Sequence, residues 1–277
     1  MSKYAVLGNP ISQSKSPLIH SLFAAQTDQA MSYSAICLEE NEFEHFVRDF
    51  FAEGGAGLNV TVPFKGNAFA LAASCSPRAE LAQAVNTLFL DDSGNICGDN
   101  TDGVGLMTDL KLNNKVTLSG QRVLILGAGG AVRGIMAALV HEQVADITIV
   151  NRTVSKAELL AGEMQSMAPI EAMSYEMLQE AASKGRCYDL IINGTSSSLQ
   201  GEMLSLDAKL IAPDCCCYDL MYSTTDTAFV KWAKQQGASL SIDGLGMLVE
   251  QAAEAFALWR GVRPNTAAVI DQLREQS

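Results

Sequence analysis

Side chains able to transfer protons and to hydrogen-bond a small polar ligand occur in short blocks of the first hundred residues. Lys65 follows the stretch Asn59–Phe64, Asn86 follows a predicted helix, and Asp102 closes the block Asp99–Asp102. Ligands of open α/β sheets bind where strands end, and these blocks lie beside predicted strand ends. An amine and a carboxylate placed together there could exchange a proton with a ligand oxygen.

Neutral donors surround this pair of charges in the sequence. Ser12–Pro17 gathers hydroxyls around a predicted helix start, whose free N–H groups suit a carboxylate. Asn59 and Thr61 alternate along a predicted strand and therefore share one face. Each residue alone also has a structural interpretation, as a helix cap, a turn residue or a solvated charge. As a set they predict a pocket of neutral donors with one cation and one carboxylate, suited to a polyhydroxylated acid.

A glycine-rich turn in the middle of the chain joins a predicted strand, Arg122–Leu126, to a predicted helix, Ala131–Glu142. Glycines allow a tight turn and a close backbone approach to a pyrophosphate, which the helix N-terminus binds through its N–H groups. The turn predicts a dinucleotide site formed by Gly127, Ala128, Gly129, Gly130 and Ala131. Val132 replaces the third glycine of the usual fingerprint, and we expect it to loosen the packing of helix on strand.

The residues after the second strand of this unit bear on the choice of dinucleotide. NAD enzymes tend to place Asp or Glu there to bond the ribose 2′-hydroxyl, whereas this chain has Asn151-Arg152-Thr153 and then Lys156. A guanidinium can pair with a 2′-phosphate and lie over the adenine. NADP is therefore predicted. The alternative is a solvated helix start, capped by Thr153 or Ser155, with both cations idle.

Strands and helices alternate around these blocks. Strands are expected at Tyr4–Leu7, Met31–Leu38, Gly57–Val62, Arg122–Leu126, Asp146–Val150, Asp189–Asn193, Cys215–Leu220 and Leu240–Ile242, with a hairpin of Asn86–Leu90 and Asn95–Gly98. Helices are expected from the N-cap Ser16 with Pro17 as first helical residue, at Glu42–Phe51, Ala68–Ala73, Ala79–Ala84 and Gly103–Leu112, and at the end over Met247–Trp259 and Asn265–Gln276. The pattern predicts two α/β domains, the second a doubly wound, Rossmann-type unit.

Composition excludes several classes of protein. The 277 residues carry a net charge of −12 without a basic run, which argues against nucleic-acid binding. No apolar run of about 18 residues suggests a membrane span, and the N-terminal apolar stretch is too short for a signal peptide, so a cytoplasmic protein is expected. The seven cysteines include no C-x-x-C pair, and Cys215–Cys217 alternate along a strand. Buried thiols in a reducing compartment, with no metal site, are predicted.

Taken in order, the blocks resemble the signature motifs of the shikimate dehydrogenase family over nearly the whole chain. The motifs are Gly8-Asn9-Pro10-Ile11 with Ser14, Ser16-Pro17 and His20; Asn59-Val60-Thr61-Val62-Pro63 with Lys65; Ala84-Val85-Asn86-Thr87; Gly98-Asp99-Asn100-Thr101-Asp102-Gly103; Gly127–Ala131; Asn151-Arg152-Thr153; Asn193-Gly194-Thr195-Ser196; Asp219-Leu220-Met221-Tyr222; and Asp243–Val249 with Gln251-Ala252. Two positions depart from the usual pattern, Pro77 where a polar residue is common and Lys156 where Arg is common.

The resemblance implies a role for each of these residues. Ser14 and Ser16 would hold the substrate carboxylate, and Lys65 would be the acid/base residue paired with Asp102. The carboxylate or ring hydroxyls would be bonded by Asn59, Thr61, Asn86, Asp102 and Gln251, with Tyr222 nearby. The cofactor would be lined by the glycine turn, by Asn151, Arg152, Thr153 and Lys156, and by Thr195, Leu220 and Gly244.

The resemblance also implies the domain plan and the reaction. Residues 1–102 would form a substrate-binding catalytic domain, 103–243 an NADP-binding Rossmann domain, and 244–277 C-terminal helices that return to the first domain. The reaction would be reversible NADPH-dependent reduction of 3-dehydroshikimate to shikimate, in chorismate and aromatic amino-acid biosynthesis, by a monomer or homodimer. A histidine-based mechanism is disfavoured because none of the candidate acid/base positions is a histidine.

Two alternatives stay open at this point. A dual quinate/shikimate dehydrogenase would have to accommodate, beside Ser14 and Ser16, the extra hydroxyl of quinate. A non-catalytic NADP-binding regulator would keep the fold and lose the chemistry, although the joint presence of Lys65, Asp102 and Gln251 weighs against it.

The predicted preference for NADP can be tested at Arg152. Arg152→Ala is expected to weaken NADP binding selectively, because it removes the cation assigned to the 2′-phosphate. Titration of the variant with NADP and with NAD measures the effect, and an equal loss of affinity for both cofactors would count against the assignment.

Overall fold

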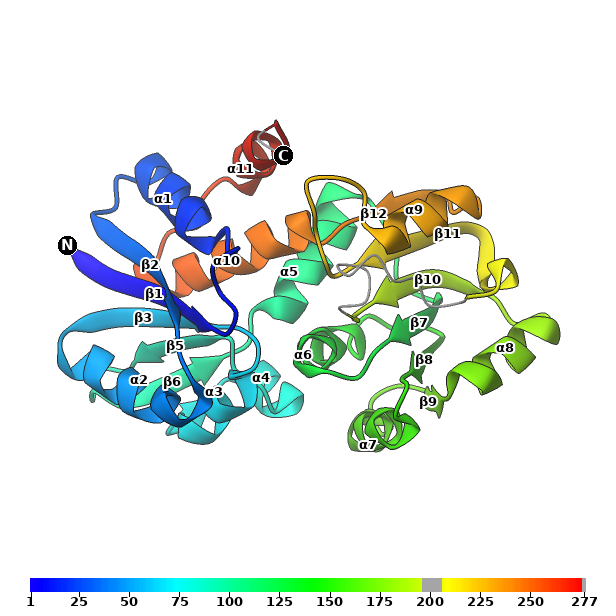
Figure 1. The fold of residues 1–277 in the computed structure, drawn as a ribbon, viewed down its shortest axis with the longest axis horizontal. Helices are drawn as coiled ribbons and strands as arrows, with labels where there is room; N and C mark the ends of the chain where they lie inside the picture. The colour runs from blue at the N-terminus through cyan, green and yellow to red at the C-terminus, as the bar shows by residue number, and fades with distance from the viewer. Residues whose placement is uncertain (196–205, 276–277) are drawn as a thin grey trace. The chain divides into compact units, whose positions relative to one another are not determined.

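The computed structural model describes residues 1–195 and 206–275, so Ser196 of the predicted motifs lies outside the described residues (Figure 1). The chain divides into two compact units, Met1–Leu106 with Leu248–Leu273, and Met107–Met247 with Arg274–Ser277. Each unit contains a six-stranded sheet. The predicted fold class is confirmed, including the return of the C-terminal helices to the first unit.

The first unit is built on a mixed sheet in the order β2-β1-β3-β5-β6-β4. Its strands are β1 (Ser2–Gly8), β2 (Met31–Cys37), β3 (Gly55–Val60), β4 (Ser74–Cys75), β5 (Thr87–Leu90) and β6 (Ile96–Asp99). Its helices are α1 (Ser16–Gln26), η1 (Glu40–Glu42), α2 (Phe43–Ala52), α3 (Lys65–Leu71), α4 (Pro77–Ala82), the start of α5 (Asp102–Thr108), and most of α10 (Leu245–Arg260) and α11 (Thr266–Glu275). The predicted hairpin is present, because β5 and β6 pair antiparallel.

Alternation along β1 separates two buried layers of the first unit. Ala5 and Leu7 belong to the apolar cluster that includes Phe43 and Val47 of α2. Tyr4, on the opposite face of the strand, packs against Trp259 of α10, with ring centroids 4.8 Å apart. The sheet therefore has helices on both faces, α2 and α3 on one and α1 and α10 on the other (Figure 1).

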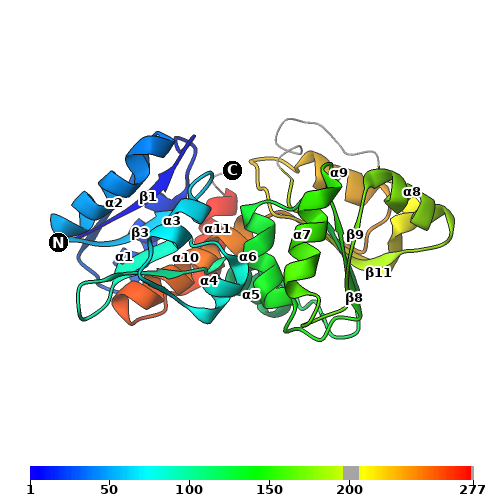
Figure 2. The same ribbon diagram turned by 90° about the horizontal axis from the view of Figure 1, so that it is seen from below.

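The second unit contains an all-parallel sheet in the order β12-β11-β10-β7-β8-β9. Its strands are β7 (Arg122–Leu126), β8 (Asp146–Val150), β9 (Ile170–Met173), β10 (Tyr188–Asn193), β11 (Ile211–Asp219) and β12 (Leu240–Ile242). Its helices are η2 (Asp109–Asn113), α6 (Gly130–Leu139), α7 (Val154–Met164), α8 (Tyr175–Ser183), η4 (Ala208–Leu210) and α9 (Ala228–Gln235) (Figure 2). This is the Rossmann strand order, in which the direction of winding reverses between β7 and β10.

Several local predictions were wrong. Helix α3 begins at Lys65, three residues before the predicted Ala68. Ser16 is the first helical residue rather than the N-cap, and its N–H donates to Ser14 Oγ at 3.3 Å. The predicted helix Gly103–Leu112 is the α-helix α5 followed by the π-helical turn η2. The short strands β4 and β9 were not predicted, because too few residues alternate to indicate a strand.

Val132 does not loosen the dinucleotide-binding unit as expected. Its side chain is fully buried. A Cβ atom added to Gly194, which follows β10, would lie 2.3 Å from Val132 Cγ2. The missing side chain at Gly194 therefore provides the space that a third glycine in the helix usually supplies.

A buried carboxylate fixes the start of α10 in the second unit. Asp109 Oδ2 accepts a hydrogen bond of 2.6 Å from the Tyr218 hydroxyl, and the Met247 N–H donates to the same hydroxyl at 3.3 Å. Asp109 Oδ1 accepts from Asn113 Nδ2 at 2.9 Å. Tyr218 is thus the link between η2 and the first turn of α10.

Removal of this hydroxyl should destabilise the protein more than removal of an ordinary buried one. Tyr218→Phe removes a hydrogen-bond donor from a buried carboxylate and is expected to cost about 1.5–3 kcal/mol of unfolding free energy. Tyr188→Phe is the matched control in the same unit, because Tyr188 bonds the neutral Thr148 hydroxyl at 3.1 Å. Its expected cost is about 0.5–1.5 kcal/mol. Urea unfolding followed by circular dichroism measures both, and equal costs would contradict the interpretation.

Candidate active site

Lys65 and Asp102 form a buried ion pair in the first unit. Lys65 is the first residue of α3, and Asp102 is the first residue of α5. Lys65 Nζ donates to Asp102 Oδ2 at 2.5 Å, and the two side chains are 12% and 7% exposed. A pair so withdrawn from water is tolerated when hydrogen bonds satisfy its remaining polar atoms.

Asn86 satisfies the other oxygen of Asp102 and holds the turn that carries it. Asn86 Nδ2 donates to Asp102 Oδ1 at 2.8 Å and to Thr101 Oγ1 at 2.9 Å, and Asn86 Oδ1 accepts from the Thr101 N–H at 2.9 Å. The Asp102 N–H donates to Asn100 Oδ1 at 3.1 Å. Asp102 is therefore fixed through its backbone and through both carboxylate oxygens.

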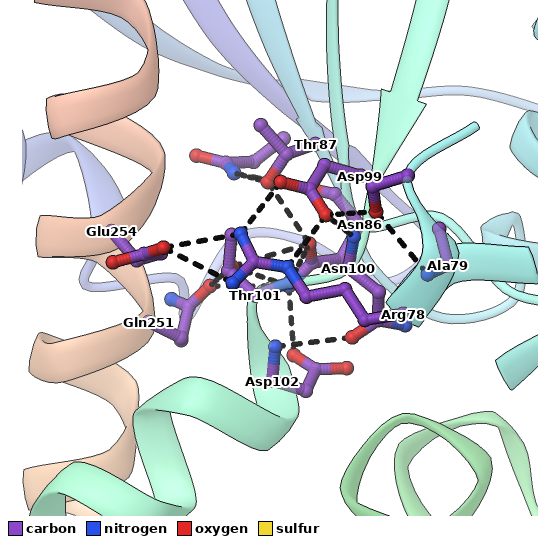
Figure 3. A network of polar contacts seen from close by, with 12 residues as sticks. Arg78, Ala79, Asn86, Thr87, Asp99, Asn100, Thr101, Asp102, Gln251 and Glu254 are labelled. Carbon is purple, nitrogen blue, oxygen red and sulfur yellow. Dashed lines mark hydrogen bonds and ion pairs between the residues drawn. The ribbon is translucent and has the colours of Figure 1, made fainter. Parts of the chain in front are cut away.

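Gln251 reaches this cluster from α10, far along the chain. Its Oε1 accepts from Thr101 Oγ1 at 3.3 Å and from Asn86 Nδ2 at 3.4 Å, while its Nε2 donates to the Leu248 carbonyl at 2.9 Å. Figure 3 shows Asn86, Thr101, Asp102 and Gln251 close together. The first unit thus brings together four of the residues that were predicted as site residues, namely Lys65, Asn86, Asp102 and Gln251.

Tyr33, which was not predicted as a site residue, connects two residues that were. Its hydroxyl donates to Asn59 Oδ1 at 2.7 Å and also hydrogen-bonds Ser16. Burial raises the pKa of Tyr33 well above its usual value of 10, and the bond to Ser16 acts in the opposite direction. Tyr33 is therefore a neutral donor at neutral pH. Its place in β2 gave no local signal, because a tyrosine is an ordinary strand residue.

His20 packs behind Tyr33 as a neutral aromatic ring. The two ring centroids are 4.2 Å apart and the planes differ by 8°. Burial lowers the pKa of His20 to about 3. At neutral pH the imidazole is therefore uncharged.

The other predicted substrate residues lie at the edges of these elements or in the other unit. Asn59 Nδ2 donates to the Asn86 carbonyl and to Thr87 Oγ1, each at 3.2 Å. Thr61 follows β3, and its N–H donates to the Leu7 carbonyl at 2.9 Å. Tyr222 follows β11 in the second unit, so its contribution to substrate binding stays a prediction.

The glycine turn of the second unit fits a pyrophosphate. Gly127 has φ +106°, a conformation that L side chains rarely adopt. A Cβ atom added to Gly127 would lie only 3.2 Å from the backbone of Gly194. Gly129 precedes α6 without a side-chain cap, and nothing lies within 4 Å of a Cβ built on it. The N–H groups of the first turn of α6, which begins with Gly130 and Ala131, have no partner within the helix and can bind an anion.

The end of β8 presents cationic and hydroxyl groups at the surface. Arg152, Thr153 and Lys156 are exposed, and Asn151 Nδ2 donates to the Thr153 carbonyl at 2.9 Å. Thr153 is the N-cap of α7, but its side chain makes no capping hydrogen bond. The alternative interpretation, in which the Thr153 hydroxyl caps a solvated helix start, is therefore not supported. Burial raises the pKa of the neighbouring Tyr175 to about 12, and the charge of Arg152 opposes that rise. These residues fit a 2′-phosphate.

Thr195, Leu220 and Gly244 follow β10, β11 and β12 respectively, so they lie at the same edge of the sheet as the glycine turn. Thr195 is fixed by Asn193, whose Oδ1 accepts from the Thr195 hydroxyl at 2.7 Å. The Leu220 N–H donates to the Asn193 carbonyl at 2.9 Å. In a parallel sheet this carboxyl edge is where a dinucleotide binds.

The part of the chain that the structure describes contains neither a membrane-spanning helix nor a metal-binding group of residues. No helix there has the length and apolar character needed to cross a membrane. No group of three His, Cys, Asp or Glu residues there could hold a metal ion. The seven cysteines are free thiols, and Cys215, Cys216 and Cys217 are all buried.

The fold and the two sites define a dinucleotide-dependent dehydrogenase with a separate substrate unit, and comparisons with known proteins agree. Family models match residues 6–88 (shikimate dehydrogenase substrate binding domain), 109–202 (shikimate/quinate 5-dehydrogenase) and 244–274 (shikimate 5′-dehydrogenase C-terminal domain). The chain is 52% identical over 274 residues to the shikimate dehydrogenase (NADP(+)) of Aeromonas salmonicida, covering 99% of this chain and 98% of that protein.

Solved structures show the same likeness. The Ael1 enzyme of Pseudomonas putida is 44% identical with a TM-score of 0.90, covering 99% of this chain and 98% of its own. Shikimate 5-dehydrogenase of Thermus thermophilus, solved with NADP(H) and shikimate, is 30% identical with a TM-score of 0.86 over 99% of both chains. The chain belongs to the shikimate dehydrogenase family.

A second buried carboxylate, Asp99, gives the first unit a pH-dependent stability. Burial acts to raise the pKa of Asp99, but hydrogen bonds from Arg78 and Ser76 and the charge of Arg78 outweigh it, so the pKa lies below its usual value of 3.8. A carboxyl group whose pKa is lowered by folding stabilises the protein above its unfolded pKa. That contribution is lost as pH falls through the folded pKa.

We therefore expect the difference in unfolding free energy between the wild type and Asp99→Asn to be constant near neutral pH. It should shrink as pH falls below about 4. Urea unfolding of both proteins from pH 7 to pH 3 measures it. A difference that stays unchanged over the whole range would show that ionised Asp99 does not contribute in this way.

Proposed function

We propose that this chain catalyses the reversible NADPH-dependent reduction of 3-dehydroshikimate to shikimate. The observation that carries the proposal is the buried Lys65–Asp102 pair, held by Asn86 and Gln251, in a chain about half identical over its full length to NADP-dependent shikimate dehydrogenases. The first unit binds the ring acid, and the second unit binds NADP.

Hydroxyl and amide groups of the first unit recognise the ring acid. Ser14 and Ser16 at the start of α1 bind the carboxylate, where the free N–H groups of the helix add to the attraction. Asn59, Thr61, Asn86 and Gln251 bond the carboxylate or ring hydroxyls, together with Asp102 and, from the second unit, Tyr222. Tyr33 keeps the Asn59 amide in one orientation through its bond to Oδ1.

NADP is held by the second unit. The pyrophosphate binds at Gly127–Ala131, the 2′-phosphate at Asn151, Arg152, Thr153 and Lys156, and the remainder along Thr195, Leu220 and Gly244. When bound, the cofactor supplies or accepts the hydride that is exchanged with C3 of the ring.

The Lys65–Asp102 pair moves the proton. In the direction of reduction, the pair delivers a proton to the developing alkoxide at C3, and in oxidation it takes the proton back. Lys65 Nζ and Asp102 Oδ2 hydrogen-bond each other at 2.5 Å, so we assign the proton transfer to the pair rather than to one residue. Asn86 occupies Asp102 Oδ1 and so directs Oδ2 toward Lys65.

We place the protein in the cytoplasm as a monomer or homodimer that acts on small molecules in chorismate biosynthesis, without nucleic-acid or membrane partners. Seven free thiols fit a reducing compartment. The net charge of −12 disfavours binding to nucleic acid.

Quinate is the second candidate substrate, because one matching family model covers shikimate and quinate 5-dehydrogenases. Quinate carries an extra hydroxyl on the carbon that bears the carboxylate, next to Ser16, which is buried and bonded to Tyr33. Steady-state assays with both acids and with both NADP and NAD distinguish the two functions, and comparable kcat/KM values for the two acids would favour dual specificity.

Lys65→Ala tests the proton-transfer role. We expect kcat for shikimate oxidation to fall by about 10²–10⁴, because positioned acid/base groups typically contribute that much. Lys111→Ala removes an exposed lysine paired with Glu142 in the second unit and is the matched control, expected to keep full activity.

Formation of NADPH with shikimate is the readout of this test. A near-wild-type kcat in Lys65→Ala would remove that residue from the mechanism. Tight NADP binding by the wild-type protein without oxidation of any ring acid would instead favour a non-catalytic regulator.

A further inference from the structure

Two segments carry the proposed acid/base and substrate residues, and they are connected twice. The turn Asp99–Asp102 leads into α5, while α10 contributes Gln251. The first connection is Gln251 itself, whose Oε1 accepts from Thr101 Oγ1 at 3.3 Å. The second lies one helical turn further along α10, at Glu254, and runs through Arg78.

Arg78 bonds the turn and the helix at the same time. Its Nε and Nη2 donate to the two carboxylate oxygens of Asp99 at 2.7 and 2.6 Å. Its Nη1 and Nη2 both donate to Glu254 Oε1 at 3.1 Å. Figure 3 shows the guanidinium between these two carboxylates. A planar guanidinium with several donors can satisfy both acids, which a single ammonium cannot do in the same geometry.

The Asp99 end of this bridge is part of the turn that positions Asp102. Asp99 Oδ1 also accepts from the Asn100 N–H at 2.7 Å and from the Ser76 hydroxyl. Asn100 in turn accepts the Asp102 N–H. A shift of Asp99 would therefore be passed to Asp102 through two consecutive bonds.

We propose that Arg78 is a positioning residue for the reaction: it holds the turn that carries Asp102 against the helix that carries Gln251, so that substrate and proton-transfer groups keep one arrangement. This inference rests on the proposed function. Arg78 itself needs no contact with the ring acid.

The charges of the three residues make the bridge more important for the structure than its number of hydrogen bonds alone suggests. Asp99 is 5% exposed and Glu254 is partly buried. Without Arg78, the carboxylates of Asp99 and Glu254 would face each other between the turn and α10. The buried Asp99 would then keep only neutral partners. Loss of one partner of a buried ion pair leaves an uncompensated charge, which the surrounding structure must move to relieve.

Arg263 supplies a matched control. It also bonds Glu254, donating from Nη1 to Oε2 at 2.7 Å, and it pairs with Glu250, yet both partners belong to α10. Its loss removes an arginine from the same glutamate and leaves the bridge to Asp99 intact.

The experiment compares Arg78→Gln, Arg78→Lys, Glu254→Gln and Arg263→Gln with the wild type. Steady-state oxidation of shikimate gives kcat and KM, titration gives Kd for NADP, and thermal unfolding shows that each variant is folded at the assay temperature. We expect Arg78→Gln to lower kcat/KM by about 10–100-fold, since small displacements of reacting groups have effects of this size. Glu254→Gln should act in the same direction, Arg78→Lys should recover part of the loss, and Kd for NADP should stay within about twofold.

Arg263→Gln should stay within about twofold of the wild type in kcat/KM, because both partners of Arg263 lie on α10 and the bridge from Arg78 to Asp99 is kept. The inference is wrong if folded Arg78→Gln and Glu254→Gln retain wild-type kcat and KM, or if Arg263→Gln loses as much activity as Arg78→Gln. If Arg78→Gln does not fold, the kcat and KM of Glu254→Gln alone test the inference. A wild-type protein that cannot oxidise shikimate would defeat the proposed function itself, a different result from an active wild type with active variants.

Discussion

The buried ion pair of Lys65 and Asp102 is the interaction on which the first unit depends. An ammonium and a carboxylate withdrawn from water are stable when every remaining polar atom has a partner. For Asp102, Asn86 bonds the second carboxylate oxygen and Asn100 accepts the backbone N–H. The same bonds that offset the desolvation of Asp102 also fix the direction of the proposed acid/base pair, so the proposed catalysis and the stability of the first unit depend on the same side chains.

The two units meet different demands with different sheets. The second unit needs a carboxyl edge with a turn for phosphate, and an all-parallel sheet with its reversal between β7 and β10 supplies it. The first unit needs many neutral donors around one charged pair. A mixed sheet allows this, because the antiparallel hairpin of β5 and β6 brings Asn86, before β5, next to the turn after β6.

Local sequence predicted the features that are encoded locally. The glycine turn, the strands β7 and β8 and the hairpin each have a signal within about ten residues. The polar blocks beside predicted strand ends indicated Lys65, Asn86 and Asp102, and the family motifs added Gln251. Tyr33 and the bridge through Arg78 were not predicted. Asn59, the partner of Tyr33, is 26 residues away, and Glu254, a partner of Arg78, is 176 residues away. Tyrosine and arginine are also ordinary residues in a strand and a helix. The effect of Val132 was misjudged for the same reason, since Gly194, which leaves the space for its side chain, follows β10, far along the chain from α6.

In the proposed mechanism, the Lys65–Asp102 pair exchanges the proton of a ring alcohol. A crystal structure of the protein with shikimate and NADP⁺ tests it most directly. We expect the C3 hydroxyl to lie within hydrogen-bonding distance of Lys65 Nζ or Asp102, at about 2.6–3.2 Å, with the carboxylate of shikimate at Ser14 and Ser16. A ring bound in another orientation, with that hydroxyl facing away from both residues, would contradict it.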